Sequence, residues 1–289
     1  MLENKPVVII GASGFVARNF RKFLYEKNLK VISISRKNFK SFPNETKIVS
    51  KNYLENELIS KIKNCSTLFH LVGIGNQSSK TTFESVNYEF TKHILSLSKK
   101  ANIKKIIYLS GLGVSQKSTS GYFISKFKAE QEIIKSNLDY VIFRPSYIVG
   151  KDDLLTKFLK KQISNGRIEM PGTGNFMMQP IYIKDVVEIF YQSLTRNNFK
   201  NVMIDLVGPE LITFKKFITL FSKQNKTKIK HLDLELVYRR ALNDPKSEFG
   251  LDDLNILMGD FKGDSAKLTR IFDLNFHSVS KLLNVGGLS

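Results

Sequence analysis

The apolar residues of the first 150 positions follow two alternating periods. Short continuous apolar runs rich in β-branched residues are typical of strands buried on both faces of a sheet. Such runs lie at 6–10, 30–35, 67–73, 104–111 and 139–146. Between them, apolar residues recur every three or four positions, as in amphipathic helices. Two such stripes are Val16, Phe20, Phe23 and Leu24, and Phe83, Val86, Phe90, Ile94 and Leu97. The alternation predicts an α/β fold with a doubly wound parallel sheet.

The regular alternation weakens after residue 150. Residues 151–166 predict a helix that ends at Gly166, and 170–175 are typical of a turn-rich loop. Residues 180–194 return to strand and helix, and 201–208 predict one more strand. Helical pieces follow, one of them opening after Thr213 as its N-cap and another at 252–261. We expect a first domain over 1–150, its sheet completed by about 179–207, and a smaller, mainly helical cap from 151–178 and 208–289.

A glycine turn joins the first predicted strand to the first helix. Gly11, Gly14 and the small Ala17 have the spacing of a dinucleotide-binding motif in the required strand–turn–helix context. Glycine permits the tight turn and the close approach of a pyrophosphate, which the helix N-terminus would attract. The alternative is an ordinary tight turn. The context favours dinucleotide binding by a Rossmann-type domain.

The end of the second predicted strand indicates which dinucleotide binds. NAD sites usually place a carboxylate there, on the ribose hydroxyls. This chain instead has Arg36 and Lys37, with no carboxylate before Glu45. A guanidinium suits a 2′-phosphate, because it makes paired charge-assisted hydrogen bonds to it. The sequence therefore favours NADP(H) and leaves NAD(H) possible.

Tyr122 and Lys126 lie four positions apart in "SGYFISKFKAE", residues 120–130. One helical turn would bring the two side chains together. Taken alone, the spacing equally fits a half-buried ring beside a solvated ammonium group. Ala129 and Ile133 continue the same face, which predicts that this face points inward.

Composition limits the other classes of function. The net charge of +19 raises nucleic acid as a partner, but the lysines are spread along the chain and form no long basic tract. The four histidines have no metal-ligand spacing, and the lone Cys65 lacks the surroundings of a reactive thiolate. No apolar run is long enough for a leader peptide or a membrane span. We expect a cytoplasmic protein that binds a small-molecule substrate, with no nucleic acid, no metal and no membrane span.

Eight segments then carry a resemblance to a known family. They are "GASGFVA", "HLVG", "SVNYEFTKHIL", "YLSGLGV", "YFISK", "FRPSYIVG", "QPIYIKDVV" and "VGPELITFKKF". In order and approximate spacing the chain resembles the extended or atypical short-chain dehydrogenases/reductases of the NAD-dependent epimerase/dehydratase group. The last three segments, with "LDDLNILMGD" and "LTRIFDLNFHSVSKLL", are most similar to the branch that includes the dehydrogenase-like accessory subunit of respiratory complex I.

The resemblance implies roles for particular residues. It implies a catalytic set of Tyr122, Lys126, Ser110 and Asn87. For the cofactor it implies contacts from Gly11, Ser13, Gly14, Phe15, Val16, Arg36, Leu71, Val72, Gly73, Tyr122, Lys126 and Pro145. For Asn87 a surface amide within a helix is an equal alternative. A cation within about 4–6 Å of a tyrosine favours the phenolate, so we expect Lys126 to lower the pKa of Tyr122 by about 1–3 units.

Two positions depart from the family pattern. The Ser or Thr that usually holds the substrate oxygen is replaced by Gly111 and Leu112, and Ser110, Ser115 and Ser118 are imperfect substitutes. The aspartate expected on adenine is missing from 48–56, where Asn52 is the nearest polar candidate.

Two functions follow from the resemblance. One is an NADP(H)-dependent oxidoreductase of the extended short-chain type that moves hydride to or from a carbonyl or alcohol, with possible epimerase or dehydratase steps. Its substrate would lie between the carboxyl edge of the sheet and the cap. The other is a non-catalytic NADP(H)-binding protein with a structural or redox-sensing role. The sequence identifies no substrate, and it allows a monomer or a homodimer.

Overall fold

The computed structural model describes residues 5–53, 56–63, 65–224, 226–244, 247 and 249–287. The first four residues, in the stretch where no leader was expected, lie outside this range, as do Leu54 and Glu55 of the segment that lacks the aspartate. The chain divides into two compact units. Unit 1 consists of residues 1–144 and 186–204, and unit 2 of residues 145–185 and 205–289.

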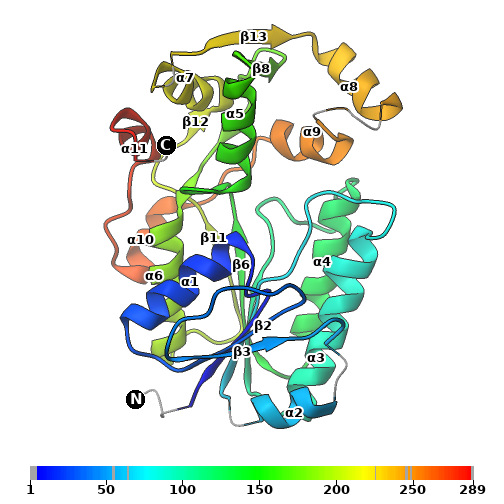
Figure 1. Ribbon diagram of the computed structural model, residues 1–289, viewed down its shortest axis with the longest axis vertical. Helices are drawn as coiled ribbons and strands as arrows, with labels where there is room; N and C mark the ends of the chain where they lie inside the picture. Colours follow the sequence, from blue (N-terminus) through cyan, green and yellow to red (C-terminus); the bar gives the residue numbers. More distant parts are fainter. Residues whose placement is uncertain are drawn as a thin grey trace. The chain divides into compact units, whose positions relative to one another are not determined.

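Unit 1 is built around a seven-stranded sheet of order β11-β6-β5-β4-β1-β2-β3 (Figure 1). The strands are β1 (Val7–Ile10), β2 (Val31–Ser35), β3 (Glu45–Val49), β4 (Thr67–His70), β5 (Lys105–Leu109), β6 (Asp139–Pro145) and β11 (Val202–Leu206). From β3 to β6 each neighbouring pair is parallel. The chain moves outward from β1 to β3 and then returns to pair β4 with the other side of β1. This reversal confirms the predicted doubly wound fold and creates a crevice position at the carboxyl ends of β1 and β4.

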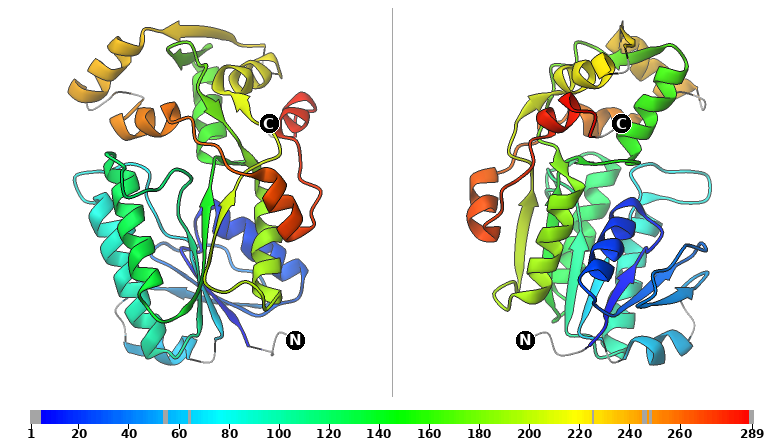
Figure 2. Two further views of the ribbon diagram at one scale, coloured as in Figure 1. Left: turned by 180° about the vertical axis from the view of Figure 1, so that it is seen from behind. Right: turned by 60° about the vertical axis from the view of Figure 1, so that its left-hand side comes forward.

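Helices cover both faces of this sheet (Figure 2). One face carries α1 (Phe15–Glu26) and α6 (Ile183–Thr195), and the other carries α2 (Asn56–Ile62), α3 (Phe90–Lys100) and α4 (Gly121–Ile134). Strand side chains alternate between the faces. Phe69 therefore packs with Phe20 of α1, at a ring-centroid distance of 4.6 Å, while its neighbour Leu68 lies in the opposite core with Ile94 and Ile133.

Unit 2 has its own core and small two-stranded sheets. β7 (Ile148–Val149) pairs with β10 (Ile181–Tyr182), β9 (Met177–Met178) with β12 (Ile212–Thr213), and β8 (Arg167–Pro171) with β13 (Lys228–Leu232). Its helices are α5 (Leu154–Ser164), α7 (Phe214–Gln224), α8 (Leu234–Asn243), α9 (Leu251–Met258), α10 (Ser265–Phe272) and α11 (Val279–Asn284). Phe217, Phe221 and Leu283 are fully buried in this core. The C-terminal region is mainly helical, as expected.

Local signals in the sequence are confirmed where they depend on near neighbours. Gly166 follows α5 with a φ of +84°, and the Thr213 hydroxyl accepts the Lys216 N–H at 3.1 Å at the start of α7. Strands β3 and β13 were not predicted, nor were β8 and the two-residue strands β7, β9 and β12. β8 ends at Pro171, inside the stretch 170–175 that was predicted as a loop. β3 and β13 leave most of their residues exposed or only half-buried, so they carry no continuous apolar run.

The C-terminal segment of unit 2 is held by two carboxylates. Asp185, in the first turn of α6, accepts two hydrogen bonds from His277. One comes from the ring Nδ1 at 2.6 Å and the other from the backbone N–H at 2.9 Å. Glu210 accepts the Ser278 hydroxyl and, at 3.1 Å, the Ser280 N–H. Burial raises the pKa of Asp185, and the bonds from His277 oppose that rise. These contacts give a structural role to the motifs "QPIYIKDVV" and "VGPELITF".

Gly208, in the second of these motifs, has no room for a side chain. A Cβ there would lie 1.9 Å from the Pro180 carbonyl oxygen. We predict that Gly208→Ala lowers the free energy of unfolding by about 3 kcal/mol, because the backbone must shift. Urea denaturation checks this. Gly75→Ala is the matched control, because a Cβ at Gly75 meets nothing within 4 Å. Equal midpoints for the two variants would contradict the prediction.

Candidate active site

Backbone hydrogen bonds fix the conformation of the glycine turn after β1. The N–H groups of Gly11 and Ala12 both donate to the Ile34 carbonyl at 3.0 Å, and the Gly14 N–H donates to Gly11 at 2.9 Å. Gly11 has a φ of +89°, a left-handed conformation that favours glycine. Gly14 is the N-cap of α1. Because Gly14 is the N-cap, the N–H groups of Phe15 and Val16 in the first turn of α1 have no carbonyl partner within the helix.

Three glycines lie just beyond the carboxyl ends of neighbouring strands of the sheet. Gly11 follows β1, Gly73 lies three residues beyond the end of β4, and Gly111 lies two residues beyond the end of β5. A Cβ on Gly11 would lie 2.8 Å from Val72 Cγ2 and 3.2 Å from the Leu71 carbonyl. The backbone at each of these strand ends therefore lies in contact with a neighbouring group, and a side chain at any of the three glycines would collide with that group.

Lys126 and Tyr122 reach neighbouring parts of this edge. A Cβ on Gly73 would lie 2.8 Å from Lys126 Nζ, and a Cβ on Gly111 would lie 3.0 Å from the Tyr122 hydroxyl. Gly73 and Gly111 follow β4 and β5, which pair in parallel up to His70 and Tyr108. Helix α4 therefore places the ammonium group of Lys126 against Gly73 and the phenol of Tyr122 against Gly111, beyond the ends of two adjacent strands.

The ammonium group of Lys126 is buried. The residue is 4% exposed, and its Nζ donates to the Leu109 carbonyl at 3.0 Å and lies 4.9 Å from the Tyr108 ring centroid. Burial lowers the pKa of Lys126 to about 8, and the Glu130 carboxylate opposes that shift. The alternative of a solvated lysine is wrong for this residue. Ala129 and Ile133 are fully buried on the same helix, which confirms the inward face.

The phenol of Tyr122 differs from the expectation. Burial raises its pKa to about 12, although the side chain keeps some exposure to solvent. The predicted lowering by Lys126 is wrong for this structure, because desolvation of the phenolate raises the pKa. Among the described residues, no hydrogen-bond partner is found for the Tyr122 hydroxyl. Tyr122 is therefore a protonated phenol at neutral pH.

Asn87 is a buried connector. It is 0% exposed and lies in η1 (Glu84–Glu89), a π-helical turn that precedes α3. Its amide accepts the Ile74 N–H at 2.9 Å, donates to the Ile74 carbonyl at 3.2 Å, and donates to Ser125 Oγ at 3.1 Å. The surface-amide alternative is therefore wrong. Because Ser125 lies beside Lys126, Asn87 joins the segment after β4 to α4.

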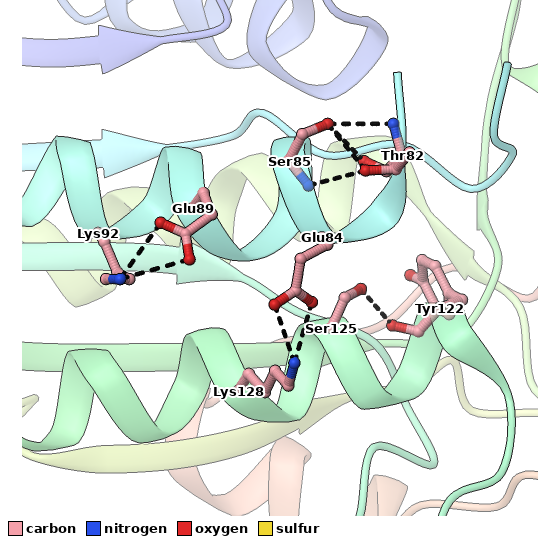
Figure 3. Close-up of polar contacts among 8 residues, drawn as sticks. All are labelled: Thr82, Glu84, Ser85, Glu89, Lys92, Tyr122, Ser125 and Lys128. Carbon is pink, nitrogen blue, oxygen red and sulfur yellow. Dashed lines mark hydrogen bonds and ion pairs between the residues drawn. The ribbon is translucent and has the colours of Figure 1, made fainter. Parts of the chain in front are cut away.

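Further contacts join η1 to α4 (Figure 3). Lys128 of α4 donates to both carboxylate oxygens of Glu84, at 2.9 and 3.1 Å. Ser125 donates to the Tyr122 carbonyl at 2.7 Å within α4. The Phe83 ring, at the start of η1, packs edge-on against the Tyr122 ring at a centroid distance of 5.8 Å. The position of the phenol is thus supported from two helices.

Ser110 is occupied elsewhere. It is 4% exposed, and its hydroxyl donates to Glu130 at 2.6 Å. Glu130 is fully buried and also accepts two hydrogen bonds from Arg144, at 2.9 and 2.6 Å. In this arrangement Ser110 has no proton to offer a substrate oxygen, so the geometry does not support that part of its predicted catalytic role. Glu130 and Arg144 were missed in the sequence, although Glu130 stands one turn beyond Lys126.

His70 is a third residue whose place was not anticipated. It is fully buried at the end of β4, and its Nε2 lies 2.9 Å from Thr91 Oγ1. Thr91 Oγ1 donates to the Asn87 carbonyl, so His70 Nε2 must carry the proton of this contact. Burial, assisted by the charge of Lys126, lowers the pKa of His70 to about 3. His70 is therefore a neutral imidazole, buried in the core beside the site.

The other predicted cofactor residues lie around the same edge. Arg36 is exposed and directly follows β2, Pro145 ends β6, and Leu71 is hydrogen-bonded through its N–H to the Ile10 carbonyl. Ser13 pairs with Ser35 through their hydroxyls at 2.8 Å. Asn52 is exposed after β3. Cys65 is buried and its pKa is raised to about 11 by that burial, so it is an unreactive thiol at neutral pH.

Comparison with known proteins identifies the family. The profile of the "NAD dependent epimerase/dehydratase family" matches residues 7–204. The chain belongs to this family. Within the described residues, no helix has both the length and the apolarity that crossing a bilayer requires.

Curated relatives come from respiratory complex I. The chain is 22% identical over 246 residues to the mitochondrial "NADH dehydrogenase [ubiquinone] 1 alpha subcomplex subunit 9" of Arabidopsis thaliana, covering 78% of this chain and 60% of that protein. It is 28% identical over 130 residues to the same subunit of Mus musculus, covering 43% and 33%. The chain thus spans less than two thirds of the length of these relatives.

Solved structures share the fold at low identity. UDP-glucuronic acid 4-epimerase from Bacillus cereus, in complex with UDP-glucuronic acid and NAD, has a TM-score of 0.76 at 16% identity, covering 96% of both chains. The NAD-dependent NDP-hexosamine 5,6-dehydratase TunA has a TM-score of 0.74 at 14% identity, covering 97% of this chain and 96% of its own. Their NAD and nucleotide-sugar ligands are properties of those proteins.

The buried ammonium group has a consequence for stability. Below pH 8, Lys126 is protonated in the folded and unfolded chains, and the full cost of its burial is present. Between pH 8 and 10.5 the folded chain loses this proton first, so the wild type gains stability. We predict that the free energy of unfolding of Lys126→Met, relative to that of the wild type, is highest below pH 8. This difference in unfolding free energy should shrink by up to roughly 3 kcal/mol by pH 10.5.

Urea denaturation of both proteins across this pH range measures the difference. Lys105 also has a pKa of about 8, lowered by burial, but its contribution is common to both proteins and cancels. A difference in unfolding free energy that does not change with pH would show that the folded chain does not bury a charged Lys126.

Proposed function

We propose that the chain is an NADP(H)-dependent oxidoreductase of the extended short-chain type, which transfers hydride to or from a carbonyl or alcohol group. The observation that carries the proposal is that Lys126 and Tyr122 lie against Gly73 and Gly111, beyond the ends of the adjacent strands β4 and β5, and that β4 also neighbours β1, which precedes the glycine turn. The family includes epimerases and dehydratases, in which transient oxidation of the substrate also requires a hydride carrier. A substrate with a ketone, an aldehyde or a secondary alcohol fits this chemistry.

The residues present fit a pyridine dinucleotide. Gly11 and Gly14 leave backbone N–H groups free to approach a diphosphate at the N-terminus of α1. At Gly73 and Gly111 the backbone meets Lys126 Nζ and the Tyr122 hydroxyl directly, so both polar groups stand at the strand ends where the nicotinamide end of the cofactor would lie. Lys126 would hold a ribose hydroxyl there. When bound, the dinucleotide supplies the hydride, which no side chain of this protein could provide.

Tyr122 is the proton donor in this proposal. Its pKa of about 12 keeps the phenol protonated at neutral pH, which is the state needed to protonate a carbonyl oxygen as hydride arrives. Lys126 supplies positive charge beside the phenol and would stabilise the phenolate that forms. Asn87 and Ser125 hold α4 in place, so the phenol and the ammonium group keep their relative positions.

Arg36 supports NADP(H) as the cofactor. It is exposed at the end of β2, where an NAD site would offer a carboxylate, and Ser35 is the last strand residue instead. Among the described residues Arg36 has no ion-pair partner, so its guanidinium is available to a 2′-phosphate. The structural neighbours named above bind NAD, so this residue is where the chain would differ from them.

A second function is favoured by a specific observation. Gly111 and Leu112 stand where a Ser or Thr would hold the substrate oxygen, and Ser110 is turned inward to Glu130. Relatives of the chain are subunits of respiratory complex I. The alternative is therefore a non-catalytic protein in which bound NADP(H) stabilises the fold or reports redox state.

Tyr122→Phe separates the two functions. For the enzyme, we predict that NADPH-dependent reduction of a panel of aldehydes, ketones and keto-sugar nucleotides falls about 100-fold or more, because the general acid is lost. NADPH affinity should stay within about threefold of the wild type. Tyr25→Phe, which changes an exposed ring on α1, is the matched control. NADPH binding without any reduction by the wild type would support the non-catalytic alternative.

Arg36→Ala tests the cofactor. We predict that it weakens NADPH binding about 10-fold or more, through loss of a charge-assisted contact, while NADH binding changes little. Calorimetry with both dinucleotides measures this. Lys22→Ala removes one positive charge from the exposed surface of α1 and controls for the general field. Equal losses of NADPH and NADH affinity would remove Arg36 from the cofactor site.

A further inference from the structure

Residues 36–44 join β2 to β3 without regular secondary structure. This loop begins with Arg36 and Lys37 and ends immediately before Glu45, the first residue of β3. Ordering a free loop of this length on ligand binding would cost about 1–2 kcal/mol for each residue that becomes fixed. A loop that discriminates between ligands therefore benefits from being held in place beforehand.

A single buried guanidinium holds this loop. Arg21, in the middle of α1, is 3% exposed and makes four hydrogen bonds. It donates to both carboxylate oxygens of Glu45, at 2.5 and 2.7 Å, and to the Lys40 carbonyl at 2.7 Å. Its remaining contact goes to the Ala12 carbonyl at 2.9 Å. Arg21 thus connects the glycine turn, the loop and the start of β3.

The loop also covers the ion pair. The Phe39 ring centroid lies 4.4 Å from the Arg21 guanidinium carbon, and that of Phe42 lies 5.5 Å away. The Phe42 N–H donates to Glu45 at 2.9 Å. Burial pushes the pKa of Glu45 upward, but the hydrogen bonds from Arg21 and its other neighbours keep the pKa below its ordinary value. The pair is therefore ionised and shielded from water.

A second tie acts at the other end of the loop. The Ser35 and Ser13 hydroxyls lie 2.8 Å apart, and Ser35 Oγ accepts the Lys37 N–H at 3.3 Å. Arg36 therefore lies between two fixed residues. Ser35 is bonded to Ser13 of the glycine turn, and the Lys37 N–H is bonded to the Ser35 hydroxyl. With Arg21 at the far end, the loop is fixed to the glycine turn at both ends.

We propose that Arg21 and Glu45 are a positioning pair that sets the preference of this chain for a 2′-phosphorylated dinucleotide. The inference rests on the proposed function, in which the glycine turn holds the diphosphate and Arg36 meets the 2′-phosphate. The diphosphate and the 2′-phosphate belong to one ligand and are a fixed number of bonds apart. Arg21 fixes the corresponding separation in the protein, because it bonds to the turn and to the loop at once.

Stability alone does not account for such a pair. Removing two charges from water costs several kcal/mol, and well-packed apolar residues of similar volume commonly replace a buried ion pair without loss. An apolar pair would make no hydrogen bonds. It therefore could not join the glycine turn at Ala12, the loop at Lys40 and the start of β3 at residue 45 as Arg21 does. The guanidinium is planar and presents its donors in a fixed fork, so it specifies the geometry of all three partners.

Arg21→Lys tests the proposal and keeps the buried charge opposite Glu45. A lysine ammonium is a point charge and cannot maintain the same fork of bonds. We expect the dissociation constant of NADPH to rise about tenfold and that of NADH to stay within about twofold, as measured by calorimetry. Phe39→Ala uncovers the pair without changing any charge and should shift the same ratio in the same direction. NADH binding confirms that each variant is folded.

The effect should also depend on Arg36. Arg36→Ala should weaken NADPH binding less in the Arg21→Lys background than in the wild type, because a mispositioned guanidinium has less to lose. If the wild type prefers NADPH but neither Arg21→Lys nor Phe39→Ala changes the preference, the cofactor assignment stands and the positioning role is overturned. Equal weakening of NADPH and NADH also overturns it. If the wild type has no preference for NADPH, the proposed cofactor fails and the inference fails with it.

Discussion

The absence of side chains at the ends of three neighbouring strands is the constraint on which the site depends. Gly11, Gly73 and Gly111 follow β1, β4 and β5, and a Cβ at any of them would meet a neighbour at 3.0 Å or less. At Gly73 and Gly111 those neighbours are the polar ends of Lys126 and Tyr122. The backbone therefore contacts the ammonium group and the phenol directly, and a residue with a side chain at either position would displace Lys126 or Tyr122.

The sequence predicts those parts of this arrangement that depend on near neighbours. The strand–turn–helix at Gly11 and Gly14, and the turn of helix between Tyr122 and Lys126, are read directly from spacing. Contacts across the sequence are not: the partner of Asn87 is Ile74, and that of Ser110 is Glu130. The apolar stripe from 83 to 97 is compatible both with a continuous α-helix and with the observed π-helical turn η1. One π-helical turn rotates the apolar face by less than the width of the stripe, so the pattern does not distinguish the two.

The most distinctive motifs of the chain serve the architecture of unit 2. Asp185 and Glu210 bind the segment around His277 and Ser278, and Gly208 allows the backbone to pass the Pro180 carbonyl. The likeness to the complex I branch was strongest in these motifs. These motifs therefore hold unit 2 together, and they carry no information about turnover, for which the proposed residues, Tyr122 and Lys126, lie in unit 1.

Lys126 and Tyr122 bear differently on the two proposed functions. Burying an ammonium group is unfavourable, and the contacts of Lys126 Nζ with the Leu109 carbonyl and the Tyr108 ring offset part of that cost. A bound anionic ligand would offset more of it. A bound dinucleotide would do so in an enzyme and in a redox sensor alike. The phenol is different, because Tyr122 has no hydrogen-bond partner among the described residues, and its ring contacts with Phe83 and Phe123 would serve phenylalanine equally well. A hydroxyl with no structural use at the carboxyl edge of the sheet is the feature that favours catalysis over binding alone.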